Sequence, residues 1–440
     1  MQPMRKDSGV TPPSGPPHLL DDFQWRGLIS VSTDLGALRE ALDAGPVTGY
    51  CGFDPTAPSL HLGNLVQILT LRRLQDAGHR PLALVGGATG LIGDPKESAE
   101  RQLNDPDVVA AWTARIQQQV EPFLDFGGGA AAHPAVMVNN LDWTAKLSAI
   151  DLLRDIGKHF RVNRMLAKDA VSARLNSDVG ISYTEFSYQI LQGLDFLELY
   201  RRYGCALQTG GSDQWGNLTA GLDLIHRVEG VSAHALATPL ITKADGTKFG
   251  KTETGTVWLD PAMTSPYAFY QFWINSDDRD VAGYLKIFSL RSRDEITELE
   301  VAVEQRPAAR SAQRALAEEL TTLVHGAAEC ERVIAASAAL FGRADLADLD
   351  EATLEAALAE TGVVPIAPDP LPAVVDLLLR TGLVDSKSAA RRAVVEGGVY
   401  LNNRRVADPE AVLETGDLLH GRWVVVRRGK RSVMGARVGP

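Results

Sequence analysis

The stretch VTGYCGFDPTAPSLHLGNLVQILTLRRLQDAGHRPLALVGG, residues 47–87, holds two short apolar runs separated by a longer helical pattern. The runs at 47–53 and 81–87 have the length and composition of buried strands. The segment between them predicts a helix over 60–78 that opens after Ser59. Strand, helix and strand in this order form a βαβ unit, and such units build a parallel sheet.

The same alternation continues along the chain. Strands are predicted at 135–140 and 205–211, and a helix at 183–204. We therefore expect an α/β fold with a Rossmann-like parallel sheet, whose ligands gather where strands end and helices begin. From Pro261 the sequence becomes mostly helical, and this pattern continues through 316–342.

The last part of the chain has a different composition. Residues 343–370 are rich in Ala, Asp, Glu and Pro, which is typical of a linker. Beyond it the sequence predicts a basic helix at 386–398, a hairpin at 399–406 that turns at Asn402-Asn403, and a strand at 422–428.

Composition indicates a globular protein of two or three domains. The chain has 440 residues, of which 45% are apolar and 22% charged. Cys51, Cys205 and Cys330 are odd in number and lack metal-ligand spacing, so we expect a reducing compartment and no metal site. No apolar run has the length of a membrane span or a signal-peptide core. We therefore expect a cytoplasmic protein, with a disordered leader rich in Pro, Gly and Ser.

Charge is distributed unevenly along the chain. The net charge is −11, but residues 365–440 carry 12 Lys and Arg against 8 Asp and Glu. A basic tail on an acidic body indicates a polyanionic partner. A solvated, charged terminus without a partner explains the same composition.

Two stretches near the predicted sheet edge offer phosphate-binding chemistry. PSLHLGN, residues 58–64, places His61 and Asn64 in the first turn of the predicted helix, where free N–H groups favour an anion and disfavour imidazolium. A lone histidine there is more often a surface or capping residue. GGATGLIGDP, residues 86–95, lacks the G-x-G-x-x-G spacing; it is either a tight turn that uses glycines at positive φ or a close approach to a ligand that ends at the Asp94 carboxylate.

The helix at 183–204 carries a polar stripe. Tyr188, Gln192 and Asp195 are spaced i, i+4, i+7 and share one face, while apolar residues occupy the opposite face. An amphipathic helix with one solvated side has the same pattern. QTGGSDQWGN, residues 208–217, follows and has the composition of a polar pocket loop, in which Trp215 is expected to belong to the core.

KADGTKFGKT, residues 243–252, resembles a P-loop whose first glycine is misplaced, because Asp245 stands where glycine is required. A P-loop also needs a strand before it and a helix after it, and this segment instead predicts a turn within a hairpin. Lys248 and Lys251 nevertheless lie three residues apart on a loop that contains glycines, and they can neutralise a triphosphate as point charges.

Taken together, these stretches resemble the class I aminoacyl-tRNA synthetases, and within them the bacterial tyrosine enzymes. The family's H-x-G-H and K-M-S-K-S motifs correspond to His61-Leu62-Gly63-Asn64 and Lys248-Phe249-Gly250-Lys251-Thr252. YCGFDPTAPSLHLGN, LVGGATGLIGDP, YTEFSYQILQGLDF, QTGGSDQWGN and KFGKT follow in the family's order and spacing, so the resemblance covers nearly the whole chain. Asn64 departs from the motif's second histidine, but an amide can still donate one hydrogen bond.

The resemblance implies a role for each matching residue. Tyr50 and Asp195 would bind the phenolic hydroxyl of L-tyrosine, and Asp94, Tyr188 and Gln192 its ammonium group. The residues implied to surround the adenosine, the activated carboxylate or the phosphates of ATP are Gly52, Asp54, Gly63, Gln208, Gly210, Gly211, Asp213, Gln214, Lys248, Lys251 and Thr252. The catalytic set is Thr56, His61, Asn64, Lys248 and Lys251, which would stabilise charge on the leaving phosphates without a nucleophilic side chain.

The family also implies domains and partners. The expected domains are a disordered leader at 1–22, a catalytic domain at 23–258, a helical anticodon-binding domain at 259–345, a linker at 346–368 and an α+β RNA-binding domain at 369–433. Arg391, Arg392, Arg404 and Arg405 would contact tRNA(Tyr). ATP would enter as a substrate with Mg²⁺, without an organic cofactor, and the enzyme would be a homodimer. The segment after Asp94 is a residue shorter than in many relatives, so Lys96 and Arg101 receive no role.

Two alternatives remain open on the sequence. Specificity for tryptophan is the nearer one, because the two catalytic domains are similar, although the Tyr50–Asp195 pair and the C-terminal module favour tyrosine. A non-catalytic RNA-binding protein that has kept the fold is the other, and the presence of His61, Lys248 and Lys251 argues against it.

Overall fold

The computed structural model describes residues 18–95, 103–166, 169–176, 180–247, 249–252, 255–342, 344–429 and 432–439. The chain forms two compact units. The first comprises Met1–Pro58 and Gly63–Ile241, and the second comprises Ser59–Leu62 and Thr242–Pro440. None of the helices in the described part of the chain is both long and apolar enough to cross a lipid bilayer.

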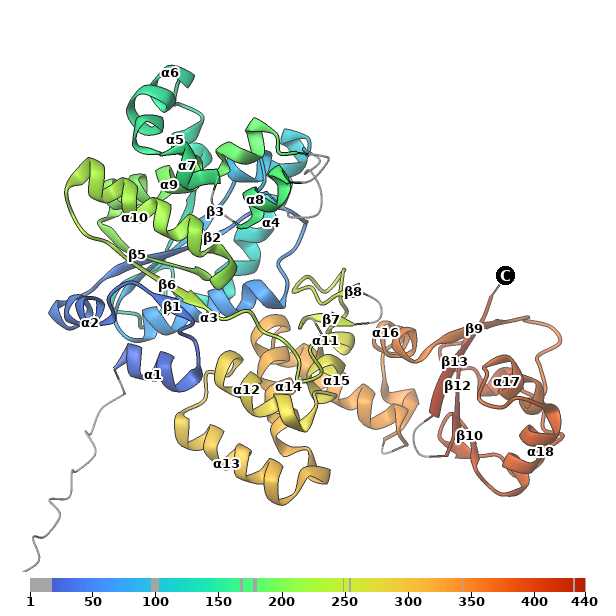
Figure 1. Cartoon of the computed structure of the whole chain (residues 1–440). Helices are drawn as coiled ribbons and strands as arrows, with labels where there is room; N and C mark the ends of the chain where they lie inside the picture. Colours follow the sequence, from blue (N-terminus) through green and yellow to red (C-terminus); the bar gives the residue numbers. More distant parts are fainter. Residues whose placement is uncertain are drawn as a thin grey trace, which may run out of the picture. The chain divides into compact units, whose positions relative to one another are not determined.

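A six-stranded sheet forms the centre of the first unit (Figure 1). Its strands, in spatial order, are β1 (Val31–Ser32), β6 (His234–Thr238), β5 (Cys205–Gly211), β2 (Thr48–Phe53), β3 (Arg80–Val85) and β4 (Val136–Asn139). β2 to β6 are parallel, and β1 pairs antiparallel with β6. The predicted parallel α/β sheet is therefore confirmed.

Helices flank this sheet. Those of the first unit are α1 (Leu19–Arg26), α2 (Leu35–Ala44), α3 (Leu62–Asp76), α4 (Pro106–Val120), α5 (Leu141–Thr144), α6 (Ala149–Asp151), α7 (Val162–Leu166), α8 (Asp169–Leu175), α9 (Tyr183–Tyr203) and α10 (Trp215–Glu229). α9 and α10 pack against β5, and α4 packs against β3 (Figure 1). α9 begins after Ser182, whose hydroxyl accepts a hydrogen bond from the Glu185 N–H, and ends at Gly204 with φ of 62°.

The order of the strands places a ligand-binding position at β2. The chain leaves β2 toward β3 and β4 on one side and later returns to β5 on the other side. Ligands of open α/β sheets bind at the carboxyl ends of the strands where this reversal occurs. The register pairs Tyr50 with Gln208 across β2 and β5, which brings two of the predicted site residues onto neighbouring strands.

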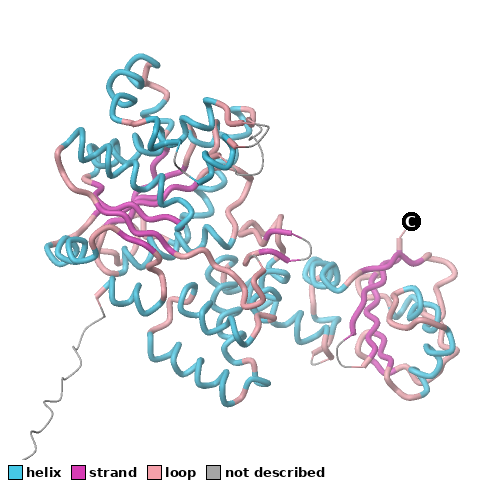
Figure 2. Tube along the Cα trace, viewed as in Figure 1, coloured by secondary structure: helices cyan, strands magenta, loops and turns pink. Residues whose placement is uncertain are grey.

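The second unit contains a helical region and a second sheet, both visible in Figure 2. The helices are α11 (Pro266–Ile274), α12 (Asp278–Phe288), α13 (Arg293–Gln305), α14 (Ser311–His325) and α15 (Ala327–Leu340). The helical pattern predicted through 316–342 is thus divided between α14 and α15, because Gly326 has φ of 91°.

The C-terminal sheet has the strand order β11-β10-β12-β13-β9. Its elements are α16 (Glu351–Thr361), β9 (Val363–Ile366), α17 (Val374–Arg380), α18 (Lys387–Val395), β10 (Val399–Leu401), β11 (Arg404–Arg405), β12 (Trp423–Arg428) and β13 (Ser432–Val438). The predicted hairpin is confirmed: β10 and β11 are joined by Asn402 and Asn403, whose φ angles of 45° and 65° suit a two-residue turn.

Two predicted boundaries are wrong. The segment expected to be a linker, 346–368, contains α16 and β9, and β9 pairs parallel with β13. Its Ala-rich composition concealed Leu354 and Leu358, which are fully buried. The leader does not extend to residue 22, because α1 begins at Leu19 and buries its apolar side chains. Residues 1–17 lie outside the described part of the chain.

Candidate active site

Tyr50 presents a buried hydroxyl at the centre of the first unit. The side chain is 1% exposed, its ring packs 5.2 Å from that of Phe196, and its hydroxyl has no hydrogen-bond partner among the described residues. Burial raises the pKa of Tyr50 well above its usual value, and the charge of Asp195 raises it further. A buried hydroxyl is normally paired, so this one is suited to a polar ligand.

Asp195 is held by two side chains that the sequence did not single out. Its Oδ2 accepts a hydrogen bond from Asn140 Nδ2 at 3.0 Å, and its Oδ1 accepts one from Trp143 Nε1 at 2.9 Å. Asn140 follows β4 directly, so a polar residue at the carboxyl end of the predicted strand 135–140 was the available signal. No such signal exists in the sequence for Trp143, because a tryptophan whose indole N–H binds a site residue looks the same in the sequence as one that only packs in the core.

Asp195 combines burial with these two donors. Burial raises the pKa of its carboxyl to about 7, although both hydrogen bonds favour the charged form and lower the pKa. Loss of hydration therefore outweighs the two donors. The phenolic hydroxyl of a ligand would supply a third donor and favour the ionised carboxylate.

Asp54, Tyr188 and Thr89 form a second group of polar contacts. The Tyr188 hydroxyl donates to Asp54 Oδ2 at 2.6 Å, and the Thr89 hydroxyl donates to Asp54 Oδ1 at 2.6 Å. Burial raises the pKa of Tyr188 well above its usual value, and the charges of Asp54 and Asp94 add to the rise. Tyr188 and Asp195 are both buried and Gln192 is half-buried, so the polar stripe of α9 does not form a solvated surface.

Most glycines in the run after β3 are needed because neighbouring side chains lie against their backbone, and not because they have positive φ. A Cβ on Gly86 would lie 2.1 Å from Asp54 Oδ1, one on Gly87 would lie 2.4 Å from Asn139 Oδ1, and one on Gly90 would lie 2.5 Å from Pro55 Cγ. Gly93 alone in this run has positive φ, at 79°. Of the two interpretations that the sequence left open, a turn that needs glycine for its positive φ therefore applies to Gly93 and not to the first three glycines.

Further polar side chains surround this site. Asn217 Nδ2 donates to Asp94 Oδ1 at 3.3 Å and to Gln214 Oε1 at 2.8 Å, which links two predicted residues through one that was not predicted. The buried Oε1 atoms of Gln192 and Gln208 have no hydrogen-bond partner among the described residues. Together with the Tyr50 hydroxyl, three buried polar atoms of this site thus have no hydrogen-bond partner among the described residues.

The other predicted residues of the first unit lie at the ends of strands or at the start of α3. Gly52 is exposed in β2, and a Cβ there would meet only Leu84, at an ordinary 3.7 Å. Gly210 and Gly211 end β5, Asp213 lies in the turn that follows, Thr56 follows β2, and Gly63 and Asn64 lie in the first turn of α3. Lys96 and Arg101 lie outside the described residues.

In the second unit, His61 is part of a strand-like contact. It precedes α3 and bridges to Trp258, so the expectation that it lies in the first helical turn is wrong. The Leu259 N–H donates to Leu60 O at 2.9 Å on the same bridge. Burial lowers the pKa of His61, which leaves a neutral imidazole at pH 7.

The KFGKT loop is anchored to the helical region. The Phe249 ring lies 5.0–5.9 Å from the rings of Phe272, Trp273, Tyr284 and Phe288 on α11 and α12. The turn before it is closed by the Gly246 N–H, which donates to Lys243 O at 2.9 Å. This agrees with the turn that the sequence predicted for this segment.

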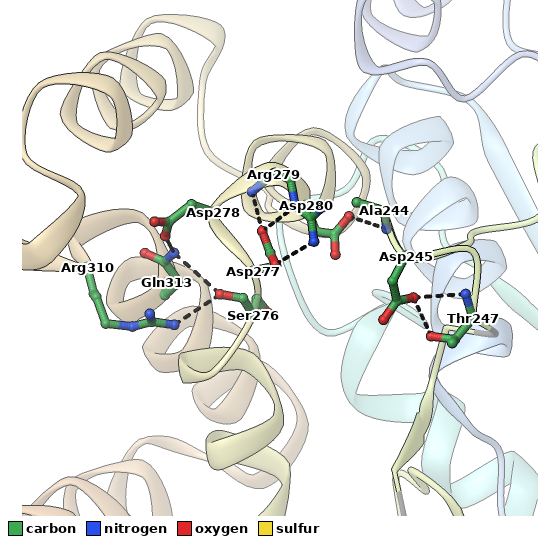
Figure 3. A network of polar contacts seen from close by, with 10 residues as sticks. All are labelled: Ala244, Asp245, Thr247, Ser276, Asp277, Asp278, Arg279, Asp280, Arg310 and Gln313. Carbon is green, nitrogen blue, oxygen red and sulfur yellow. Dashed lines mark hydrogen bonds and ion pairs between the residues drawn. The ribbon is translucent and has the colours of Figure 1, made fainter.

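A second anchor holds this turn to α12 (Figure 3). The Ala244 N–H donates to Asp280 Oδ1 at 2.8 Å, and Asp280 lies in the first turn of α12. β7 (Lys251–Thr252) pairs with β8 (Gly255–Thr256), so no helix follows the loop and the P-loop context is absent from this described segment. Lys248 and the side chains of Lys251 and Thr252 lie outside the described residues.

The basic residues predicted to contact RNA lie in one module. Arg391 and Arg392 are exposed on α18, and Arg404 and Arg405 are exposed on β11. Arg391 forms an ion pair with Glu410 at 3.1 Å, which the sequence did not predict. No group of three or more His, Cys, Asp or Glu side chains suited to a metal ion occurs among the residues that the structure describes.

The chain is similar to known proteins over most of its length. Residues 42–342 match the family model of class I tRNA synthetases (W and Y), and residues 359–434 match that of the tyrosine–tRNA ligase SYY-like C-terminal domain. The chain is 69% identical over 419 residues to a protein named tyrosine–tRNA ligase from Acidothermus cellulolyticus, covering 95% of this chain and 98% of that one. It is 66% identical over 423 residues to its namesake from Streptomyces griseus, covering 96% and 99%.

Solved structures show the same fold. A C-terminally truncated mitochondrial tyrosyl-tRNA synthetase from Coccidioides posadasii is 32% identical, with a TM-score of 0.64 over 72% of this chain and 90% of that one. A tryptophanyl-tRNA synthetase from Encephalitozoon cuniculi, bound to tryptophan, is 14% identical with a TM-score of 0.53 over 71% of this chain and 87% of that one, which shows a shared fold alone. The chain belongs to the class I tRNA synthetases of the tryptophan and tyrosine family, in the branch of the tyrosine–tRNA ligases.

Proposed function

We propose that the protein is a tyrosine–tRNA ligase. It joins L-tyrosine to the AMP part of ATP, forming tyrosyl-adenylate and releasing pyrophosphate, and then transfers the tyrosyl group to the 3′-terminal ribose of tRNA(Tyr), releasing AMP. The observation that favours tyrosine is the buried hydroxyl of Tyr50, which has no hydrogen-bond partner in the described part of the chain and interacts electrostatically with Asp195. The phenolic hydroxyl of a bound tyrosine can donate a hydrogen bond to the Asp195 carboxylate and accept one from Tyr50. Tryptophan has no hydroxyl to pair with both groups.

The tyrosine ligand would be held at both ends. Tyr50 and Asp195 receive its phenolic hydroxyl, while Asp94, Tyr188 and Gln192 receive its ammonium group. The unpaired Oε1 of Gln192 supports this placement, since an ammonium group supplies the missing donor.

ATP would bind along the ends of β2 and β5. Gly52, Asp54, Gly63, Gln208, Gly210, Gly211, Asp213 and Gln214 surround the adenosine and the activated carboxylate. The carboxylate of tyrosine attacks the α-phosphorus, and Thr56, His61, Asn64, Lys248, Lys251 and Thr252 stabilise the charge on the departing pyrophosphate. The lowered pKa of His61 supports its role as a neutral hydrogen-bond donor. Mg²⁺ enters bound to ATP as part of the substrate.

The proposed partners are tRNA and a second copy of the chain. Arg391, Arg392, Arg404 and Arg405 contact the phosphates of tRNA, as expected for exposed arginines on one module. The enzyme is cytoplasmic and acts as a homodimer. Exposed apolar side chains on α6 and at the start of α9 support the dimer: Ile150 and Tyr183 are 66% and 69% exposed.

The amino-acid specificity is tested by ATP–pyrophosphate exchange with each of the twenty amino acids. Tyrosine alone should support exchange, whereas exchange with tryptophan, or with none, would contradict the proposal and favour one of the two alternatives. Tyr50→Phe should narrow the gap between tyrosine and phenylalanine, because it removes one of the polar groups that phenylalanine leaves unpaired. The dimer is tested by sedimentation equilibrium, in which Ile150→Asp should shift the protein toward the monomer.

A further inference from the structure

Thr89 lies between the two carboxylates of the candidate site. It opens a short 3-10 turn (Thr89–Leu91) after β3, and its side chain is 2% exposed. Its Oγ1 is 2.6 Å from Asp54 Oδ1 and 3.0 Å from Asn140 Nδ2. The comparisons and the motifs assign no role to this residue.

The direction of each hydrogen bond around Thr89 is determined by its neighbours. The Ala88 N–H donates to Asn140 Oδ1 at 2.7 Å, so the amide nitrogen of Asn140 faces the other way. That nitrogen has two hydrogens, one for Thr89 and one for Asp195. The hydroxyl of Thr89 therefore accepts from Asn140, and its own single hydrogen is donated to Asp54.

These contacts connect the two ends of the site. At one end Asp54 also accepts from Tyr188, and at the other end Asp195 also accepts from Trp143. We propose that Thr89 is a positioning residue for tyrosine activation: through Asp54 and Asn140, its hydroxyl sets the orientation of the groups at both ends of the amino acid. This inference rests on the proposed placement of tyrosine between Asp195 and Tyr188.

Two other buried threonines use their hydroxyls differently from Thr89. The hydroxyls of Thr70 and Thr113 each donate to a carbonyl of their own helix, Val66 O and Val109 O, at 2.8 Å. The hydroxyl of Thr89 instead contacts side chains 35 and 51 residues away in the sequence. Gly86 permits this contact, because a Cβ there would lie 2.3 Å from Thr89 Oγ1.

The test compares Thr89→Val with Thr89→Ser in ATP–pyrophosphate exchange. Valine keeps the shape and removes the hydroxyl, which leaves a buried N–H of Asn140 unpaired. We expect kcat/KM for tyrosine to fall on the order of tenfold or more, and the ratio of tyrosine to phenylalanine activation to fall with it. Serine keeps the hydroxyl and should restore both values to within about twofold of the parent.

Thr113→Val is the matched control, because it removes a buried threonine hydroxyl on α4, outside the candidate site. The proposal is overturned if Thr89→Val keeps the parent's kcat/KM and discrimination, or if serine fails to restore them. Thr89→Ala, which also lacks the hydroxyl, carries the same expectation should the valine variant fail to fold. If Tyr50→Phe also leaves discrimination unchanged, the placement of tyrosine is wrong; if only Thr89→Val does, the role of Thr89 is wrong.

Discussion

Gly86 and Gly52 lie at the ends of adjacent strands but differ in what surrounds them. A Cβ on Gly86 would lie 2.1 Å from Asp54 Oδ1 and 2.3 Å from Thr89 Oγ1, whereas one on Gly52 would make only an ordinary contact with Leu84 at 3.7 Å. Glycine in a strand interior costs conformational entropy, so a glycine without a crowded neighbour needs another explanation. A ligand that approaches the backbone of Gly52 supplies one.

Alanine should therefore affect ATP binding at Gly52, and stability and tyrosine activation at Gly86. Gly52→Ala should leave stability unchanged or raise it by about 0.4–1 kcal/mol, while KM for ATP rises. Gly86→Ala should lower tyrosine activation because it displaces the Asp54 carboxylate, and should cost about 1–3 kcal/mol of stability. Thermal unfolding and exchange kinetics on both variants check this, and an unchanged KM for ATP in Gly52→Ala would remove that glycine from the ATP site.

The Asp195 carboxyl makes stability depend on pH. Its pKa is about 7 in the folded protein and near the ordinary 3.8 when unfolded, so the folded state binds more protons between these values. Stability from this group is fully present below pH 4 and is lost as pH rises to 7, by up to about 4 kcal/mol. The parent should therefore lose stability relative to Asp195→Asn across this range, as measured by urea unfolding at a series of pH values. Parallel curves would show that the carboxyl titrates normally.

At the scale of elements, the turn before the KFGKT loop depends on the start of α12. Arg310 and Gln313 brace that start from the other side, through Ser276 O at 3.0 Å and Asp278 Oδ1 at 2.6 Å (Figure 3). Asp280 thus offers the loop a fixed acceptor for the Ala244 N–H.

Asp280→Ala should release the turn and lower the rate of pyrophosphate exchange, with little change in tyrosine binding. The loss of one such hydrogen bond to a charged acceptor corresponds to about 1.5–3 kcal/mol. Asp294→Ala is the control, because Asp294 is likewise an acidic residue in the first turn of a helix, α13. Equal exchange rates in the two variants would show that the anchor has no part in catalysis.

The loop after Asp125 is held by hydrogen bonds to the Asp125 carboxylate. The Asp125 carboxylate accepts the backbone N–H groups of Gly127, Gly128, Gly129 and Ala131, and these bonds lower its pKa to about 2. Its stabilising effect is present above pH 4 and is lost as pH falls toward 2. Asp125→Ala should therefore destabilise the protein at pH 7 and make less difference at pH 2.5, as measured by chemical unfolding. An equal difference at both pH values would contradict this account.

Some of these elements could be predicted from the sequence and others could not. The strand and helix containing Tyr50 and Asp195 follow from local periodicity, and the parallel sheet follows from the alternation of strands and helices. The spatial order of the strands was not predicted. Thr89, Asn140 and Asn217 were missed because their importance arises from contacts between distant segments, which periodicity does not encode. α16 was missed because composition outweighed the spacing of its buried leucines.

At the scale of the whole molecule, we propose that residues before 253 activate tyrosine and that the C-terminal module, residues 346–439, binds tRNA. Removing that module tests this proposal. The chain should end after Gly342, between α15 and α16, because a cut within β9 would divide that strand and remove its partner β13. The truncated C. posadasii relative shows that a protein of this fold can be studied without its C-terminal part. α16 packs against α11 and α15, so the shortened protein loses that cover.

Tyrosine-dependent exchange should survive this truncation, because the proposed tyrosine and ATP sites lie before residue 253, whereas charging of tRNA should fall sharply. The loss relative to the full-length protein should be largest at low salt and shrink as salt rises, because a protein with fewer phosphate contacts releases fewer counterions and depends less on salt. Should truncation destabilise the helical region, the full-length variant with Arg391→Glu and Arg392→Glu tests the same point, since both side chains are exposed. Arg115→Glu, an exposed arginine on α4, is the control for the change in charge. Full charging in the double variant at physiological salt would mean that these arginines form a solvated surface without a role in binding tRNA.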